Sequence, residues 1–339
     1  MATTQLNGHR LGVYIYDPID APVDWLIERG LHVTLGAPLD SPGRTRPKIS
    51  ARELIAGAVG HAALLGASGA LITREVMEGV PTLRCISKLG IGYEVIDVDA
   101  ATDLGILVTN TPVHGEIGPV AEHTLALMLA LAKQVHWYTP SYIAAGRWRD
   151  PAHMSTLLAG ATVGIVGFGR IGQSVAARLQ GWECRLLAAD PAAISTPFGV
   201  ELVELSTLLA ESDIVTLHAP GVPAGSCPLL DDDHLALMKP TALLVNTARG
   251  NLVDQAALER RLRAGLLAGA ALDVFMPEPP QPDEPILSAP NLVATPHMSA
   301  WAAPIRKEMV TMAFENLWAA LSGNVPQYLV NPEVLERLR

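Results

Sequence analysis

Short apolar runs alternate with segments of helical spacing along most of the chain. The apolar runs predict β-strands at residues 11–16, 31–35, 61–65, 83–87, 106–109, 162–166, 184–189, 213–217, 242–246, 268–272 and 292–294. Segments such as 51–56 and 73–79 have helical spacing and lie between the strands. Because strand and helix alternate in both parts of the chain, the sequence predicts an α/β fold with two Rossmann-like parallel-sheet domains.

Two longer segments predict long helices. Pro119–Val135 is nearly uncharged and hydrophobic over much of its circumference, and Trp301–Leu321 follows the last predicted strand. A helix that is apolar on most sides is buried between domains or in a subunit interface. We therefore expect the 119–135 helix to pack against its twin in a homodimer. The proline-containing segment 38–48, which carries Arg44, Arg46 and Lys48, is expected to be a surface loop.

A glycine-rich turn stands between a strand and a helix. Residues 162–166 run directly into Gly167-Phe168-Gly169-Arg170-Ile171-Gly172, and the next strand ends at Asp190. Gly167 permits a tight turn, Gly169 leaves room for a pyrophosphate, and Gly172 lets the helix pack closely on the strand. This order is the dinucleotide-binding pattern. The alternative is a glycine-containing turn in an unrelated α/β protein.

Asp190 decides which dinucleotide is expected. Its carboxylate can accept hydrogen bonds from both ribose hydroxyls, whereas a 2′-phosphate would meet its negative charge. Pro191, Ala192 and Ala193 follow it, so no Arg or Lys stands there to hold such a phosphate. The sequence therefore predicts NAD rather than NADP, with the phosphates on the helix N-terminus.

Composition and charge narrow the class of protein. The 339 residues are 49% hydrophobic and 17% charged, with a net charge of −10. This acidic balance argues against a nucleic-acid partner, and no basic amphipathic segment suggests membrane attachment. The three cysteines are widely spaced, as in a protein with reduced thiols, and we find no clustered ligands for a metal. Residues 1–10 lack the apolar segment of a signal peptide, so we expect a cytoplasmic enzyme.

Charged side chains follow three predicted strands of the second part of the chain, where parallel sheets place their ligands. Arg249 follows the 242–246 strand, and a guanidinium can bind a carboxylate by two parallel hydrogen bonds. Glu278 lies in a proline-rich segment after 268–272, and His297 follows 292–294 and can donate a proton near neutral pH. Each has an ordinary alternative when taken alone: a structural salt bridge, a solvated loop carboxylate and a structural histidine.

A second glycine-containing loop follows the predicted strand at 83–87. Gly90 and Gly92 leave the backbone N–H groups of Ile91 and Gly92 able to approach an anion. A plain turn is the alternative.

Taken together, these segments resemble the D-isomer-specific 2-hydroxyacid dehydrogenase family, including its glyoxylate/hydroxypyruvate reductases and phosphoglycerate dehydrogenase-like members. The resemblance covers residues 63–332. The motifs that carry it are GFGRIG at 167–172, NTARG at 246–250, DVFMPEP at 273–279 and TPH at 295–297. It implies an NAD-dependent oxidoreductase that interconverts a small 2-oxo acid and its D-2-hydroxy acid.

The resemblance also implies a role for individual residues. His297 would exchange a proton with the substrate oxygen, Glu278 would pair with His297 and raise its pKa, and Arg249 would bind the substrate. The amides of Ile91 and Gly92 would bind the substrate carboxylate. Asp273 would contact the nicotinamide carboxamide. The implied cofactor-binding residues are Gly167, Gly169, Arg170, Ile171, Gly172, Asp190, His218, Ala219, Pro220, Thr247, Ala248, Asp273 and His297, without a metal.

Departures from the family bear on the substrate. Gly66-Ala67-Ser68-Gly69 stands where many members carry an Arg or a Ser with Thr, so this loop lacks a charge and disfavours a phosphorylated substrate. Lys88 is the nearest compensating cation. We therefore favour glyoxylate or hydroxypyruvate, with phosphoglycerate dehydrogenase-like activity as the alternative. Trp301 stands where smaller residues are usual and is expected to narrow the pocket.

The expected organisation is a discontinuous substrate domain, residues 1–110 and 298–339, with an NAD-binding Rossmann domain inserted at 111–297. The active site would lie between the two domains. Two other readings remain. A formate dehydrogenase typically pairs its histidine with Gln, where this chain has Glu278. An NADH-sensing, corepressor-like binding protein would keep the same motifs but show tight NADH binding with negligible turnover.

Overall fold

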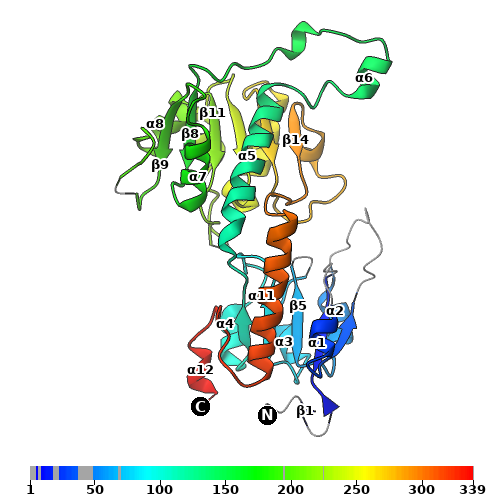
Figure 1. Ribbon diagram of the computed structural model, residues 1–339. Helices are drawn as coiled ribbons and strands as arrows, with labels where there is room; N and C mark the ends of the chain where they lie inside the picture. The colour runs from blue at the N-terminus through cyan, green and yellow to red at the C-terminus, as the bar shows by residue number, and fades with distance from the viewer. Residues whose placement is uncertain are drawn as a thin grey trace. The chain divides into compact units, whose positions relative to one another are not determined.

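The computed structural model describes residues 5–6, 9–17, 23–36, 49–67, 70–193, 195–223 and 225–338. The chain forms two compact units, Met1–His114 with Ala303–Arg339 and Gly115–Ala302. Each unit is built on a parallel sheet, so the predicted α/β class is confirmed (Figure 1). The basic residues Arg44, Arg46 and Lys48, and also Ser68 and Gly69 of the uncharged loop, lie outside the described residues.

The first unit contains a five-stranded parallel sheet in the order β4-β3-β5-β6-β7. Its strands are β3 Gly12–Ile15, β4 His32–Leu35, β5 Ala63–Gly66, β6 Cys85–Lys88 and β7 Leu107–Thr109. An antiparallel pair, β1 Gln5–Leu6 and β2 His9–Arg10, precedes them and was not predicted. All five strands point the same way, so the segments after β5, β6 and β7 leave the sheet at one edge.

The last long helix of the chain completes this first unit. The helices here are α1 Asp24–Ile27, α2 Ala51–Ala58, α3 Arg74–Glu78, α4 Val98–Asp103, α11 Ala303–Leu321 and α12 Val334–Arg337. α2 begins with a capping box in which the Ser50 side chain accepts the N–H of Glu53. α11 packs on β5, β6 and β7, where the Ser87 hydroxyl donates to the carbonyl of Ala313 at 3.3 Å. Residues 303–339 therefore belong to the same compact unit as the N-terminal sheet.

The second unit contains a seven-stranded parallel sheet in the order β10-β9-β8-β11-β12-β13-β14. Its strands are β8 Thr162–Val166, β9 Arg185–Ala189, β10 Glu201–Leu202, β11 Ile214–Leu217, β12 Leu243–Asn246, β13 Gly269–Leu272 and β14 Leu292–Ala294. β10 was not predicted, because two exposed residues give no apolar run. The chain moves outward in opposite directions from β8 and from β11, so the topological switch point lies between these two strands.

The helices of the second unit cover both faces of its sheet. They are α5 Ile117–Ala132, α6 Pro140–Ala144, α7 Arg170–Arg178, α8 Leu205–Glu211, α9 Asp232–Leu237 and α10 Gln255–Arg263, with 3-10 turns η1 His114–Glu116, η2 Pro151–His153, η3 Gly250–Leu252 and η4 Pro285–Ser288. α7 begins at Arg170, inside the glycine turn. The turn therefore feeds directly into a helix N-terminus.

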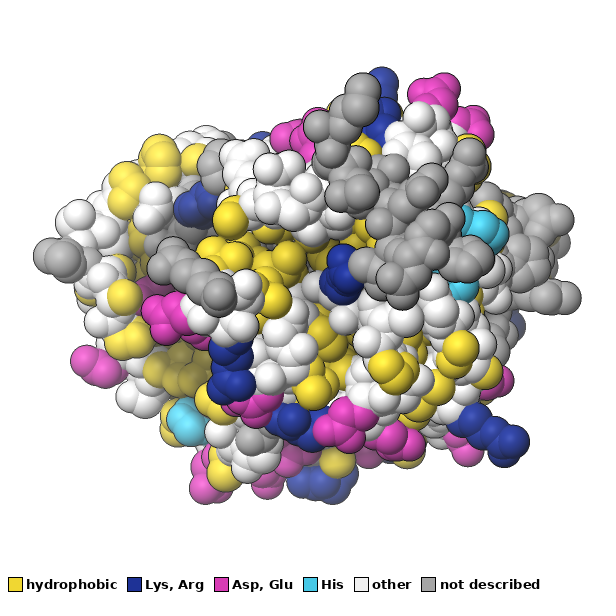
Figure 2. All heavy atoms as spheres, turned by 90° about the horizontal axis from the view of Figure 1, so that it is seen from below, with side chains coloured by type: hydrophobic (Ala, Val, Ile, Leu, Met, Phe, Trp, Pro, Cys, Tyr) yellow, Lys and Arg dark blue, Asp and Glu magenta, His cyan; other side chains and the backbone are white. Residues whose placement is uncertain are grey.

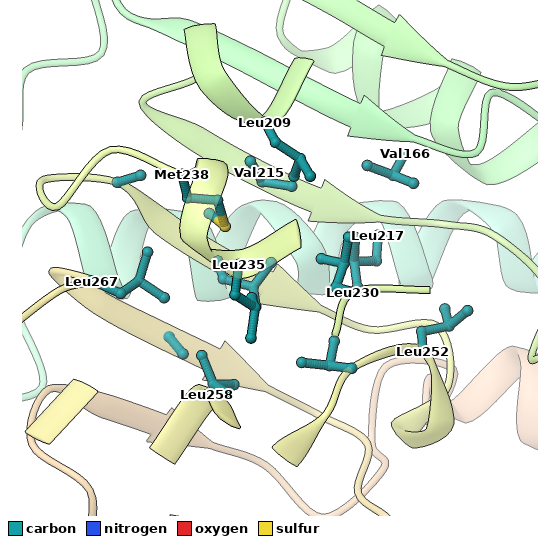
Figure 3. Close-up of a cluster of buried hydrophobic side chains, with 14 of the residues drawn as sticks. Val166, Leu209, Val215, Leu217, Leu230, Leu235, Met238, Leu252, Leu258 and Leu267 are labelled. Atoms are coloured by element: carbon teal, nitrogen blue, oxygen red, sulfur yellow. The ribbon is translucent and has the colours of Figure 1, made fainter. Parts of the chain in front are cut away.

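Alternate side chains of the strands in the second unit pack into two separate hydrophobic clusters. Leu244 of β12 belongs to one cluster with Leu217 of β11 and with helix residues such as Leu209 and Leu235. Figure 3 shows the side chains of Leu217, Leu209 and Leu235 in this cluster. Val245, the next residue of β12, instead packs with Met128 of α5 on the opposite face. Successive side chains of a strand point to opposite faces, so these strands are buried on both sides.

Helix α5 is buried inside the second unit. It packs on α7, β12, β13 and β14, and its buried side chains include Leu127, Met128 and Leu131. Much of the apolar surface that the sequence assigned to a twin subunit is therefore used within this unit. After α5 the chain extends away from the sheet of this unit in a long segment that contains α6 (Figure 1). Several large side chains of this segment are exposed. We call residues 135–157 the arm.

Charges of both signs mix on the surface. Along the lower edge of the face in Figure 2, Lys and Arg side chains lie next to Asp and Glu side chains. None of the described helices combines the length and the apolarity that a membrane-spanning segment needs.

Candidate active site

The glycine turn lies at the switch point of the second sheet. Gly167 has φ +87°, a backbone conformation that L side chains rarely adopt. A β-carbon there would also come within 2.6 Å of the backbone nitrogen of Ala219, because β8 and β11 are neighbours. The N–H of His218 donates to the carbonyl of Val166 at 2.7 Å and fixes this approach. Gly167 is therefore required by its conformation and by its surroundings.

Gly169 and Gly172 differ in what surrounds them. A β-carbon at Gly172 would overlap the carbonyl oxygen of Gly167, so this glycine lets α7 lie close to β8. A β-carbon at Gly169 would meet nothing within 4 Å. Gly169 is also the residue that precedes α7, and no side chain caps that helix. Open space beside an uncapped helix N-terminus fits a pyrophosphate, as the sequence predicted for this turn.

Asp190 is held in place by backbone groups. Its Oδ2 accepts the N–H of Phe168 at 2.7 Å, and its Oδ1 accepts the N–H of Ala192 at 2.8 Å. The carboxylate at the end of β9 is thus tied to the glycine turn at the end of β8. Two fixed oxygens next to the turn are suited to accept ribose hydroxyls.

His218 follows β11 and begins the predicted cofactor segment His218-Ala219-Pro220. Burial lowers the pKa of His218 to about 3, so its ring is neutral near neutral pH. The ring lies 3.0 Å from the hydroxyl of Thr216. This histidine therefore acts as a fixed neutral group at the switch point and does not titrate near neutral pH.

Asn246, at the end of β12, shapes the turn that carries Arg249. Its side chain is fully buried, accepts the N–H of Ala248 at 3.0 Å, and donates to the carbonyl of Arg249 at 2.9 Å. Thr247 is anchored by its hydroxyl, 2.8 Å from that of Thr124 on α5. Sequence reasoning took Asn246 only as part of a motif and missed this clamp.

Gly250 brings this turn against the segment that carries Glu278. A β-carbon at Gly250 would overlap the carbonyl oxygen of Phe275. The N–H of Phe275 in turn donates to Oε1 of Glu278 at 3.0 Å. The chain that leaves β12 and the chain that leaves β13 are therefore in close contact, as neighbouring strand ends in one sheet allow.

His297 and Glu278 form a pair. The Nδ1 atom of His297 lies 2.8 Å from Oε2 of Glu278. Burial acts to lower the pKa of His297, but the hydrogen bond to Glu278 and the negative charges of Glu278 and Asp273 outweigh it, and the pKa is raised. The positive charge of Arg249 opposes that rise. The structure thus pairs His297 with Glu278 and places Arg249 close enough for its charge to act on His297, while the catalytic roles of the three residues stay a prediction.

Asp273 holds the backbone on both sides of His297. Its fully buried carboxylate accepts the hydroxyl of Thr295 at 2.6 Å and the N–H groups of Met298 at 2.7 Å and Ser299 at 3.0 Å. Its carbonyl accepts the N–H of His297 at 2.8 Å. The geometry gives Asp273 a loop-positioning role, while its contact with a nicotinamide carboxamide stays a prediction.

The predicted carboxylate-binding amides lie in the first unit. Gly90 has φ +101°, and its N–H donates to the hydroxyl of Thr111 at 2.7 Å. The Asn110 side chain donates to the carbonyl of Ile91 at 2.8 Å, so the loop is fixed to the end of β7. Within the described part of the chain, no acceptor is bonded to the N–H of Ile91 or Gly92. Both donors are available, and their role in binding stays a prediction.

Two polar residues near the site went unnoticed in the sequence. His123 of α5 approaches Thr295 and Asp273, and Glu116 precedes α5 with only 7% of its surface exposed. Burial raises the pKa of Glu116 to about 7, against the opposing charges of Arg249 and Arg170. Neither residue stands at a strand end, so the sequence offered no positional signal for them. Among the described residues, no cluster of His, Cys, Asp or Glu side chains could hold a metal ion.

Comparison with known proteins identifies the family. The family model described as "D-isomer specific 2-hydroxyacid dehydrogenase, NAD binding domain" matches residues 125–299. The chain belongs to the D-isomer specific 2-hydroxyacid dehydrogenase family. The glycine turn, Asp190, Arg249, Glu278 and His297 all lie within the matched segment.

Relatives within the dehydrogenase family differ in the activity they carry. A glyoxylate reductase of Korarchaeum cryptofilum is 41% identical over 273 residues, covering 78% of this chain and 81% of that protein. A D-3-phosphoglycerate dehydrogenase of Mycobacterium leprae is 37% identical over 306 residues, covering 87% of this chain. The match spans only 56% of the length of that second protein.

Solved structures share the dehydrogenase fold. The TT0316 protein of Thermus thermophilus has a TM-score of 0.81 at 36% identity, covering 94% of this chain and 100% of that one. An NAD-dependent formate dehydrogenase of Staphylococcus aureus in complex with NAD has a TM-score of 0.79 at 27% identity, covering 91% and 95%. The chain is therefore an NAD-dependent oxidoreductase, as the sequence predicted.

Proposed function

We propose that this dehydrogenase reduces a small 2-oxo acid to the D-2-hydroxy acid with NADH and catalyses the reverse reaction. The observation that carries the proposal is the His297–Glu278 pair, 2.8 Å apart, at the strand end next to the Arg249 turn. A histidine whose pKa a carboxylate raises can hold a proton near neutral pH and release it to a carbonyl oxygen.

The orientation of the His297 ring assigns its two nitrogens. Nδ1 faces Glu278 and donates its proton there, which leaves Nε2 as the nitrogen that exchanges a proton with the substrate. In reduction, Nε2 gives its proton to the substrate carbonyl oxygen, and the ring becomes neutral. In oxidation, Nε2 takes the hydroxyl proton. When bound, NADH supplies the hydride that reaches C2 of the 2-oxo acid, and NAD accepts it in the reverse direction.

Arg249 binds the substrate anion in this proposal. Its backbone is fixed by the Asn246 clamp, and one of its guanidinium nitrogens donates to the carbonyl of Ala248 at 2.7 Å. A planar guanidinium can bind a carboxylate or a carbonyl oxygen by two parallel hydrogen bonds. The amides of Ile91 and Gly92 stay predicted donors to a substrate carboxylate.

We favour glyoxylate or hydroxypyruvate as the substrate. Gly66 and Ala67 contribute no charge after β5, and Lys88 is nearly buried and donates to the carbonyl of Leu89 at 2.7 Å. An uncharged loop and an engaged cation favour an unphosphorylated substrate over a phosphorylated one. The 41% identical glyoxylate reductase supports this choice, whereas the phosphoglycerate dehydrogenase relatives support the alternative.

We further infer that two copies associate through the arm. Trp148, Met154 and Leu157 are 70%, 77% and 71% exposed, and Val135 and Ile143 are also exposed. A group of large apolar side chains that a single copy leaves in water marks an interaction surface. Aromatic residues and methionine are enriched in such interfaces.

A spectrophotometric assay of NADH oxidation tests the proposed reaction. The substrates are glyoxylate, hydroxypyruvate, pyruvate, phenylpyruvate and 3-phosphohydroxypyruvate, with NADPH run alongside NADH. We expect turnover on an unphosphorylated 2-oxo acid, preference for NADH because of Asp190, and loss of about 100-fold or more in kcat for His297→Asn. NADH binding without turnover on any of these acids would instead favour the corepressor-like binding protein.

A further inference from the structure

His123 contacts two residues that hold the segment around His297, namely Thr295 and Asp273. It lies on α5, and its Nε2 atom is 3.1 Å from the hydroxyl oxygen of Thr295 and 3.6 Å from Oδ1 of Asp273. Its side chain is about three-quarters buried, with 24% of its surface exposed. The helix around it is otherwise mainly apolar, so this polar contact is specific to one position of α5.

The direction of the hydrogen bonds follows from the donors present. Asp273 is acceptor-only when ionised, so the 2.6 Å contact uses the single hydroxyl proton of Thr295. The oxygen of Thr295 can then only accept from His123. The Nε2 atom of His123 must therefore carry a proton, and the chain of hydrogen bonds runs from His123 through Thr295 to Asp273.

The end of this chain of hydrogen bonds is the backbone around His297. Met298 and Ser299 donate to the two carboxylate oxygens of Asp273, and His297 donates to its carbonyl. His297 itself has φ +54°, which is strained for a residue other than glycine. Such a conformation persists only where the surroundings fix it. Here the hydrogen bonds of Asp273 fix this backbone, and His123 orients the Thr295 hydroxyl that donates to Asp273.

We propose that His123 is a positioning residue for the proton donor, acting through Thr295 and Asp273 on the orientation and the proton affinity of His297. The inference rests on the proposed function of His297. His123 does not touch the reacting atoms. Its effect is to keep the Asp273 carboxylate at a fixed place, from which it holds the loop and contributes negative charge to the imidazolium.

Three charged side chains act on the proton affinity of His297. The groups that act on the pKa of His297 are Glu278 and Asp273, which raise it, and Arg249, which lowers it. The other acidic residue next to His123, Glu122, is paired instead with Arg178 of α7 at 3.2 Å. A displacement of Asp273 would therefore lower the proton affinity of His297 without any change at Glu278.

The test compares His123→Leu, which removes the donor, with His123→Gln, whose side-chain amide can still donate. Thr295→Val removes the middle of the chain of hydrogen bonds. His136→Leu is the matched control, because His136 lies just after α5 and its Nε2 bonds the Asn291 side chain at 3.1 Å, at the opposite end of β14. The readouts are the His297 pKa by NMR titration of the full chain, kcat and KM for the 2-oxo acid, and the free energy of unfolding.

We expect His123→Leu to lower the His297 pKa and to reduce kcat on the order of 10-fold with little change in KM, since a donor misplaced by a fraction of an ångström reacts slowly. His123→Gln should restore most of both values. His123→Leu should add little to Thr295→Val, because both break one chain of hydrogen bonds.

Two results would overturn the inference. One is an unchanged His297 pKa in His123→Leu with a loss of stability equal to that of His136→Leu, which would make His123 a packing residue. The other is full additivity of His123→Leu and Thr295→Val. A wild-type protein that turns over no 2-oxo acid would instead contradict the proposed function, while the NMR titration would still decide the inference.

Discussion

The Nδ1 atom of His297 lies 2.8 Å from Oε2 of Glu278, and Oε1 of the same carboxylate accepts the N–H of Phe275 at 3.0 Å. Both oxygens of Glu278 are therefore engaged, and the imidazole is oriented by a partner that is itself fixed to the backbone. The pair joins the segment after β13 to the segment after β14.

Replacement of Glu278 by Gln should move the alkaline limit of reduction. The carboxylate raises the pKa of His297, so the protonated ring required for reduction persists to higher pH in the wild type. In Glu278→Gln that pKa falls, and kcat/KM for the 2-oxo acid should begin to decline at lower pH. A loss of one pKa unit corresponds to about 10-fold in kcat/KM on the alkaline side. A pH profile identical to that of the wild type would contradict the pairing.

Substitution by alanine should affect stability at one glycine of the turn and NADH binding at another. Gly172→Ala should destabilise the protein by about 1–3 kcal/mol, because its β-carbon would overlap the Gly167 carbonyl. Gly169→Ala should leave the free energy of unfolding nearly unchanged, because open space surrounds that position. It should instead weaken NADH binding. Urea unfolding and NADH fluorescence titration measure the two effects, and equal loss of stability in both variants would contradict this assignment.

Glu116 should make stability depend on pH. Burial raises its pKa from 4.5 to about 7. The protonated side chain therefore contributes fully to the free energy of unfolding below about pH 4.5, and this contribution is lost as the pH rises through 7. Glu116→Gln should therefore match the wild type in acid and exceed it above pH 7, by up to about 3 kcal/mol. Urea unfolding across this range measures the difference. Glu122→Gln, on the exposed side of α5, is the control and should show no such gain at high pH.

The arm should carry the association of two copies. Trp148→Asp places a charge where 70% of the tryptophan surface meets water in a single copy, so it should lower the stability of a dimer without affecting the fold. Light scattering across a concentration series measures the shift toward monomer. Leu266→Asp, at an exposed apolar position outside the arm, is the control. A wild-type protein that stays monomeric at all concentrations would show that the arm does not pair two copies.

The local pattern of the sequence sufficed for much of the fold. Each of the eleven predicted strands has a counterpart in the structure, from β3 to β14 with β10 excepted, because buried parallel strands leave long apolar runs. The glycine turn was equally readable. Gly167 is required by its positive φ, and Gly172 is required because a β-carbon there would overlap the carbonyl of Gly167. Both requirements arise within one strand–turn–helix unit and are therefore local.

Elements without a local signal escaped prediction. β10 is two residues long, and the β1–β2 pair is equally short. The 119–135 helix was correctly expected to be apolar, but the pattern could not say which surface covers it. α5 packs on α7 and on three strands that lie far later in the chain, so its partner was set by the fold of the whole unit.

By itself, the sequence determined the fold class, the nucleotide turn and the residue types that stand at strand ends. These features depend on periodicity, on glycine and on the rule that parallel strands present their carboxyl ends at one edge. Only the tertiary structure decided that Asp273 grips both sides of His297, that Gly250 makes room for Phe275, and that His123 stands behind Thr295. Those relationships join residues from different strands and helices, and no spacing along the chain encodes them.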